Sequence, residues 1–312
     1  MCWRRRCFFG GALALLSAAR GTSAHGTLNL PESRNGAQAG LGLGQGGRTQ
    51  PYSVAYWYTD ETRHTGNATI ADDACALLTC FQCAPQQAQQ GGTGGCASSR
   101  QARTPWRAPG TAPLRGGPCG TIGWDGAVGR NASITAGTEL PPTSPAAVWR
   151  IGAAEKVAWG LAVNHGGGYS YRLCPAGEAL TEACFQRTPL AFVGNTSDIV
   201  GPRGETLYTI PAARTAVGTT PAGSQWTRNP VPDAQGPGSP NFPPPVPGLA
   251  GHCCDAGCPD GCGDKAFGVW SLMDRVRVPS HLPPGAYVLS WRWDCEELPQ
   301  VWSNCADVQL RA

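Results

Sequence analysis

The sequence lacks a long apolar run, a large basic surplus and sustained helical periodicity. After the first two dozen residues, no stretch approaches the roughly 18 to 20 apolar residues of a membrane-spanning helix, so no membrane partner is expected. The chain has 24 basic and 21 acidic residues. A nucleic-acid-binding chain normally carries a clear basic excess, so no nucleic-acid partner is expected. Without helical periodicity, an all-β fold is favoured.

The first 24 residues have the parts of a secretory signal peptide. The basic segment MCWRRRC precedes the apolar run FFGGALALLSAA, and TSA ends in a small residue suited to cleavage. We therefore predict a signal peptide over 1–24 and a secreted, extracellular and monomeric mature chain over 25–312. Removal of the leader takes four arginines from a formal charge of +3 and leaves −1.

Cysteine usage agrees with export. Cys2 and Cys7 leave with the leader, so 13 of the 15 cysteines remain, and in an oxidising compartment most of them should pair. The sequons at Asn67, Asn131 and Asn195 predict a glycoprotein that carries these residues in surface loops.

Alternation of apolar and polar or small residues predicts strands. It is clearest in KVAWGLAV (156–163) and YVLSWRWD (287–294), which we expect to be half-buried. Shorter strand candidates, separated by glycine and proline, are AVWRIG (147–152), YSYRLC (169–174), TLYTIP (206–211) and DRVRVP (274–279). Together they favour an antiparallel β-sandwich with long loops and several disulfides. The segment EALTEACFQ (178–186) predicts a short helix in a connection.

Residues 224–266 are rich in proline, glycine and cysteine. A strong strand candidate follows at 287–294, so we interpret this segment as an insertion within a single domain. His252 and four nearby cysteines allow two readings, a zinc knuckle or a set of disulfides, and export favours the disulfides.

His25 would be the first residue of the mature chain. A terminal histidine offers two nitrogens, its α-amine and its imidazole, which can chelate one metal ion. An α-amine titrates near pH 8, so binding at neutral pH costs about 1 kcal/mol for proton release. Nitrogen ligands in a tetragonal arrangement suit Cu(II). The alternative is that His25 is only the place where the mature chain starts.

A second imidazole would complete a three-nitrogen site, and four histidines are candidates: His64, His165, His252 and His281. His165 differs from the others because it follows a predicted strand and opens HGGGYSYRLCP. The three glycines let a partner approach closely. The alternative is an ordinary loop histidine.

Four segments together resemble one family. They are AHG at the cleavage site, PESR (31–34), NHGGGYSYRLCP (164–175) and WDCEELPQVWSNCADVQL (293–310). In this combination and order the chain resembles the copper-dependent lytic polysaccharide monooxygenases, nearest to the chitin- and cellulose-active bacterial and animal branches. Residues 84–118 and 212–266 have no counterpart in that pattern. The resemblance implies an immunoglobulin- or fibronectin III-like sandwich on which His25 and His165 bind one copper ion.

The resemblance also implies roles for other residues. Trp302 stands where the family keeps a Tyr or Phe on the axial side of copper, so here an apolar wall is expected, unless Trp302 is plain core. Gln300 matches a glutamine that some branches place near the metal, whereas Glu297 or Glu296 would replace it in other branches. Arg172 is either a neighbour of the site or a salt-bridged strand residue. The resemblance further implies disulfides Cys174–Cys184 and Cys295–Cys305.

The activity implied is oxidative cleavage of an insoluble β-1,4-linked polysaccharide, chitin or cellulose, at C1 or C4. It requires copper cycling between Cu(II) and Cu(I), an external reductant, and hydrogen peroxide or oxygen as co-substrate. Two other classes remain open, a copper carrier with the same histidine brace and a non-catalytic polysaccharide-binding sandwich. A glycosidase would need two facing carboxylates roughly 5 to 10 Å apart, and no pair is marked by its setting.

Overall fold

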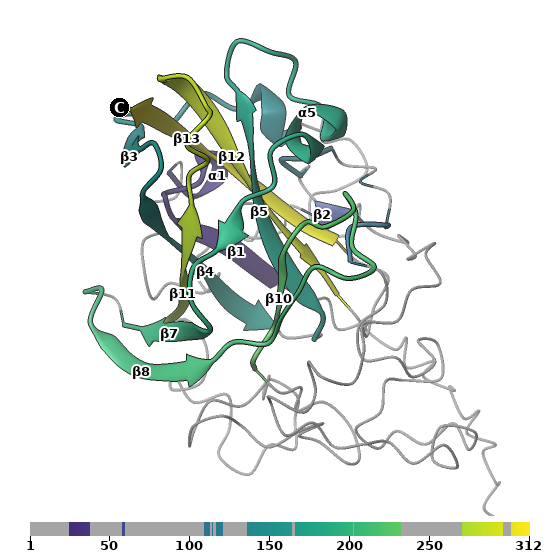
Figure 1. Cartoon of the computed structure of the whole chain (residues 1–312), viewed down its shortest axis with the longest axis vertical. Helices are drawn as coiled ribbons and strands as arrows, with labels where there is room; N and C mark the ends of the chain where they lie inside the picture. Colours follow the sequence, from purple (N-terminus) through teal and green to yellow (C-terminus); the bar gives the residue numbers. More distant parts are fainter. Residues whose placement is uncertain are drawn as a thin grey trace, which may run out of the picture.

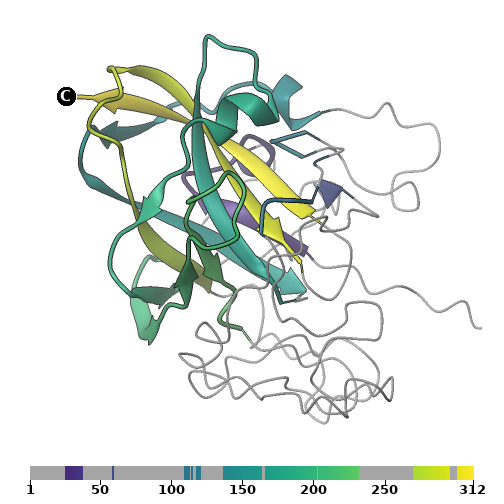
Figure 2. The same cartoon turned by 45° about the vertical axis from the view of Figure 1, so that its right-hand side comes forward.

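The chain folds into two β-sheets packed face to face (Figures 1 and 2). This computed structural model describes residues 25–37, 58–59, 109–112, 114, 117–120, 136–163, 166–201, 203–231, 270–295 and 301–312. The predicted all-β sandwich is confirmed. None of the helices in these residues is long and apolar enough to cross a membrane. The leader, Asn67 and Asn131 lie outside the described residues, whereas Asn195 is exposed in a turn, as a sequon requires.

The first sheet has the order β1-β4-β11-β7-β8, with β6 also paired to β11. Its strands are β1 (His25–Leu30), β4 (Ala154–Val163), β6 (Ala191–Phe192), β7 (Thr196–Val200), β8 (Thr206–Pro211) and β11 (Ser271–Arg277). All of its pairs are antiparallel. Three of these strands, β4, β8 and β11, fall on predicted segments.

The second sheet has the order β2-β13-β12-β5-β10-β9. Its strands are β2 (Tyr58–Thr59), β3 (Ala147–Arg150), β5 (Gly168–Pro175), β9 (Arg214–Thr215), β10 (Trp226–Arg228), β12 (Gly285–Asp294) and β13 (Val301–Arg311). One pair departs from the predicted antiparallel pattern, because β3 runs parallel to β13. The helical turns are α1 (Arg34–Ala37), η1 (Gly137–Glu139) and α5 (Glu182–Gln186).

Aromatic side chains fill the space between the sheets. The ring of Trp159 on β4 lies 5.0 Å from Tyr169 on β5 and 5.2 and 5.1 Å from Trp291 and Trp293 on β12. All four side chains are fully buried. Rings of this size bury a large apolar area, and tilted pairs at these distances add a further favourable term. The alternation seen in the sequence therefore marks the faces that join the two sheets.

The expectation that residues 287–294 form a half-buried strand is wrong on one point, because both faces of β12 are covered. Val288, Ser290, Arg292 and Asp294 point away from the sandwich core, yet all are buried. The covering layer consists of residues 109–112, residues 117–120 and α5. The hydroxyl of Ser290, for example, donates to the carbonyl of Pro118 at 2.7 Å. Polar outer positions of β12 thus bind a third layer instead of water.

The predicted helix within 178–186 is confirmed as the shorter α5. The Thr181 side chain accepts a hydrogen bond from the backbone N–H of Cys184, which is the usual N-cap contact. The expected Cys174–Cys184 disulfide is present and joins α5 to β5, with a Cα–Cα distance of 5.5 Å. This short-range bond holds part of the third layer against the sheet.

The predicted Cys295–Cys305 disulfide is wrong, because Cys305 bonds to Cys119 with a Cα–Cα distance of 4.9 Å. Cys305 lies opposite Ser290 in the β12–β13 pair. Cys295 follows Ser290 by five positions, about 16 Å along a strand, whereas bonded Cα atoms lie within about 7 Å. The two cysteines also face opposite ways, since Cys295 belongs to the core cluster and Cys305 points to the outer layer.

The segment 224–266, expected as an insertion, begins inside the sheet. Its first residues include β10, which pairs with β5 through Thr227 and Tyr169. The framework therefore extends to at least Val231. Residues 232–266, His252 and the neighbouring cysteines lie outside the described residues.

Candidate metal centre

His25, the predicted first residue of the mature chain, is a strand residue. β1 begins at His25, whose backbone is the partner of Val163 at the end of β4. Gly26 is the partner of Leu161, and the register shifts between His25 and Gly26. The His25 backbone is thus fixed beside Val163 at the end of β4. Val163 precedes His165 by two residues in the chain. The His25 side chain and the whole of His165 lie outside the described residues.

The turn from β4 to β5 passes from one sheet to the other immediately after His165. Gly166 and Gly167 have φ values of 62° and 76°, in the left-handed region that favours glycine. A Cβ at Gly167 would lie 1.9 Å from the carbonyl oxygen of Asp294. Gly167 therefore allows the backbone of Asp294 to approach closely, which holds the turn against the end of β12.

One indole, that of Trp293, contacts the residue after each of the two histidines. Its Nε1 donates to the carbonyl of Gly166 at 2.8 Å. On the other side, Gly26 lies so near that an added Cβ would be 3.1 Å from the Trp293 ring. Because Trp293 is fully buried and packed against Trp159, it is a rigid support. The backbones next to both histidines therefore converge at one end of the sandwich.

Trp302 lies beside this support. It is the register partner of Trp293 across β12–β13, the ring centroids are 6.4 Å apart, and its side chain is fully buried. On its other side β13 pairs with β2, where Tyr58 is the partner of Trp302. The structure thus places Trp302 in the core at the same end as the turn after His165. Whether it also faces a metal stays a prediction.

Of the other predicted ligand candidates, the described residues include only His281, and it lies far from the turn after His165. His281 is exposed in the turn before β12, and from Gly285 to Trp293 that strand runs about 27 Å at 3.4 Å per residue. His281 is therefore at the opposite end from Gly26. His64 and His252 lie outside the described residues, as do Glu296, Glu297 and Gln300, which connect Cys295 to Val301.

Arg172 is an ion-paired strand residue, the second of its two expected roles. Its guanidinium binds the Glu182 carboxylate and reaches the Ser290 hydroxyl at 3.3 Å on the outer face of β5 and β12. Burial lowers the pKa of Arg172, and the attraction of Glu182 opposes that effect. A role for Arg172 beside a metal stays untested.

The start of the chain is anchored to β13 by two polar contacts. Arg34, in the PESR segment, forms a bidentate buried ion pair with Asp307, with distances of 2.9 and 2.6 Å. The backbone N–H of Leu28 donates to the Asn304 side chain at 2.8 Å. Paired charges and satisfied donors make such burial tolerable. These contacts fix the position of β1, and His25 is the first residue of that strand.

This arrangement fits a copper ion in chemical terms. Cleavage before His25 would provide a free α-amine, which together with two imidazoles makes three nitrogen donors of the kind that Cu(II) prefers. The structure holds the backbone beside both histidines at one end of the sandwich. In the described part of the chain, no group of three or more His, Cys, Asp and Glu lies close enough to hold a metal.

Sequence reasoning missed Trp293 as a member of this site. Trp293 was expected on one face of the strand YVLSWRWD and at the start of the segment WDCEELPQVWSNCADVQL (293–310), but no role at the metal was predicted for it. Its position at the start of that segment was the available signal. No role was predicted for Gly26 either. A residue without a side chain next to a predicted ligand was the available signal, because it allows close packing.

No family model and no curated protein matches this sequence. Solved structures are similar to it. A chitin-binding domain from Burkholderia pseudomallei has 13% identity and a TM-score of 0.39, with 93% of this chain and 100% of that chain covered. An AA15 lytic polysaccharide monooxygenase from Thermobia domestica in the Cu(I) state has 14% identity and a TM-score of 0.27, and this match covers 53% of this chain and 62% of that chain. A CBM33 protein from Bacillus amyloliquefaciens in complex with Cu(I) has 12% identity and a TM-score of 0.27, with 92% and 100% covered. Similarities this low carry no conclusion about activity.

Proposed function

We propose that the mature chain is a secreted copper-dependent lytic polysaccharide monooxygenase. Its substrate is an insoluble β-1,4-linked polysaccharide, chitin or cellulose, which it cleaves oxidatively at C1 or C4. One observation carries the proposal: Trp293 contacts Gly26 and donates a hydrogen bond to Gly166, the residues that follow His25 and His165. This convergence supports a site made from the chain's first residue and a distant turn.

In this proposal His25 binds copper through its α-amine and imidazole, and His165 binds it through its imidazole. When bound, copper supplies one-electron redox chemistry with an external reductant and hydrogen peroxide or oxygen. The protein's part is to hold the nitrogen donors. β1 fixes the amine by pairing with the end of β4, and Trp293 fixes the turn after His165.

The remaining predicted residues shape the surroundings of the donors. Trp302, a fully buried indole next to Trp293, excludes water from one side of the site. Gln300, or Glu297 or Glu296 in its place, offers a hydrogen bond near the co-substrate. The chain end at residue 25 must be free, because an amide nitrogen is a poor metal ligand at neutral pH.

The first experiment compares His165→Ala with His281→Ala. His281 is an exposed histidine at the opposite end of β12, so its removal controls for loss of an imidazole from the surface. We expect His165→Ala to weaken copper binding by orders of magnitude and to stop release of oxidised oligosaccharides from chitin and cellulose. His281→Ala should match the wild type in both assays. An unchanged copper isotherm in His165→Ala would refute the brace.

The second experiment retains Ala24 in front of His25. This addition turns the His25 amine into an amide and moves the new amine out of chelating reach, while it leaves the folded contacts of β1 in place. We expect similar thermal unfolding but loss of copper binding and of product release. Equal activity of the two forms would show that His25 is only where the chain starts. If the form that begins at His25 binds copper but releases no product, a copper carrier is favoured. If that form binds polysaccharide but neither binds copper nor releases product, a non-catalytic sandwich is favoured.

A further inference from the structure

Two segments that the family pattern lacks, 84–118 and 212–266, are joined where the structure describes them. The backbone N–H of Thr220, in the second segment, donates to the carbonyl of Pro109, in the first, at 2.9 Å. Gly110 has a φ of 87°, and a Cβ at this position would lie 2.1 Å from the carbonyl oxygen of Thr220. Only a glycine permits so close an approach in this conformation. The two segments therefore pack as one unit.

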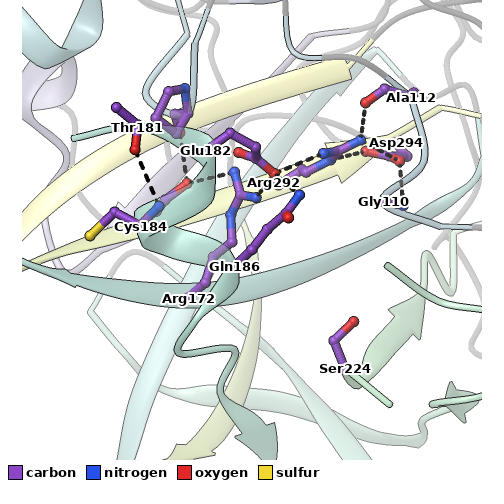
Figure 3. Close-up of polar contacts among 12 residues, drawn as sticks. Gly110, Ala112, Arg172, Thr181, Glu182, Cys184, Gln186, Ser224, Arg292 and Asp294 are labelled. Carbon is purple, nitrogen blue, oxygen red and sulfur yellow. Dashed lines mark hydrogen bonds and ion pairs between the residues drawn. The ribbon is translucent and has the colours of Figure 1, made fainter. Parts of the chain in front are cut away.

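An arginine and a carboxylate at the end of β12 hold this unit on the outer face of the second sheet (Figure 3). The Arg292 guanidinium donates to the carbonyl of Ala112 at 2.7 Å. The Asp294 carboxylate accepts from the backbone N–H of Gly110 at 2.9 Å. The two side chains also pair with each other at 2.6 and 3.0 Å, and both are buried. Charge-assisted contacts of this kind are strong and fix geometry.

The same aspartate lies against the turn that follows His165. Its side chain points to the outer face, because it follows the core residue Trp293 by one position. Its backbone carbonyl lies in the space that a Cβ of Gly167 would occupy. The carbonyl of Gly167 in turn accepts from the backbone N–H of Asn229, in the second of the two joined segments, at 2.8 Å. The turn is therefore in contact with both Asp294 and the unit that Asp294 holds.

We infer that Asp294 is a positioning residue for the candidate metal centre. Its carboxylate holds the joined segments and its backbone holds Gly167, so that together they set the place of the turn and of His165 before it. This inference rests on the proposed function, in which His165 binds copper. Asp294 itself does not bind the metal, because its carboxylate is directed to Arg292 and Gly110. Segments without a counterpart in the family pattern thus help to orient a copper ligand in this chain.

Asp294→Asn tests the role of the carboxylate. The amide keeps the shape but replaces one oxygen by an NH₂ group, so a donor then meets either the Gly110 N–H or the Arg292 guanidinium. Two readouts follow the turn: the backbone NMR signals of Gly166 and Gly167 in the copper-free mature chain, and the Cu(II) EPR spectrum of the loaded chain. We expect both glycine signals to shift, the Cu(II) spectrum to change and copper affinity to fall at least tenfold.

Asp274→Asn is the matched control. Asp274 is also a buried carboxylate paired with an arginine, Arg214, at 3.0 Å. Its register partner in β4 is Val157, six positions before Val163, or about 20 Å from the end of the strand at which β1 begins. Removal of either carboxylate leaves a buried arginine without its partner, so both variants should unfold at lower denaturant concentration. The control should keep the wild-type glycine signals and Cu(II) spectrum.

A double variant covers the case in which Asp294→Asn fails to fold. Arg292→Gln combined with Asp294→Asn removes both members of the ion pair, so that neither charge is left buried alone. The carboxylate that accepts from the Gly110 N–H is still lost. We therefore expect the same shifts of the glycine signals and the same change in the Cu(II) spectrum.

The outcomes separate this inference from the function on which it rests. Wild-type glycine signals, or a wild-type Cu(II) spectrum, in a folded Asp294 variant would overturn the positioning role and leave the proposed function standing. Equal changes in Asp274→Asn would also overturn it, because the effect would then be one of general stability. A wild-type chain that binds no copper would instead refute the proposed function, and this role with it.

Discussion

Trp293→Phe is the sharpest test of how the candidate metal centre is built. The substitution keeps an aromatic ring in the core but removes the indole N–H that donates to the buried Gly166 carbonyl at 2.8 Å. We expect two effects, a lower free energy of unfolding and weaker copper binding. The second effect follows because the turn after His165 loses one of its anchors.

Trp291→Phe is a matched control on the same strand and face. Trp291 is also fully buried, its ring lies 5.2 Å from Trp159 against 5.1 Å for Trp293, and it also borders Gly26. Its Nε1 has no hydrogen-bond partner among the described residues. Loss of ring area is therefore common to both variants, and the hydrogen bond is the difference.

The size of the difference follows from that hydrogen bond. A typical internal hydrogen bond contributes about 1 kcal/mol, and leaving a buried partner unsatisfied costs about 1 to 3 kcal/mol. Trp293→Phe should thus be less stable than Trp291→Phe by about 1 to 3 kcal/mol, or roughly five- to 150-fold in the unfolding equilibrium. Denaturant unfolding of the copper-free proteins measures this difference, and a copper isotherm measures the second effect.

Two results would refute the reasoning. Equal stability of the two variants would mean that the Trp293 hydrogen bond contributes nothing. A stability difference with identical copper affinity would mean that Trp293 supports the fold without positioning the turn after His165.

Three further predictions concern single side chains. Trp302→Tyr, which brings a possible oxygen ligand, should change the Cu(II) EPR spectrum of the folded protein, and an unchanged spectrum would leave Trp302 as plain core. Gly167→Ala should cost about 1 to 2 kcal/mol for its positive φ alone and more for the clash with Asp294, whereas Gly177→Ala, with open space around its Cβ, should be nearly neutral in thermal unfolding. The folded-state pKa of Glu182 is lowered, so its stabilising contribution is complete above the unfolded value of about 4.3 and is lost as the pH falls through the folded value. The stability difference between wild type and Glu182→Gln should therefore shrink with falling pH in that range, and a difference that grows would contradict the ion-pair assignment.

The sequence by itself determined the local features of this protein. Alternation predicted the strand at 287–294, and EALTEACFQ predicted a helical turn that Thr181 caps. The Cys174–Cys184 disulfide, implied by the resemblance, joins residues only ten apart. Each of these features depends on side chains that are close along the chain, and their periodicity and capping chemistry are visible in the letters.

Only the tertiary structure decided which distant residues meet. The register of β12 against β13 placed Cys305 opposite Ser290 and out of reach of Cys295, so that Cys119, 186 residues away, became its partner. The same register and the turn after His165 brought Gly26 and Gly166 to one indole. Such meetings depend on sheet order and on which face a strand presents. Neither is written in a local pattern, since a shift of one residue would turn every side chain of a strand to the other face.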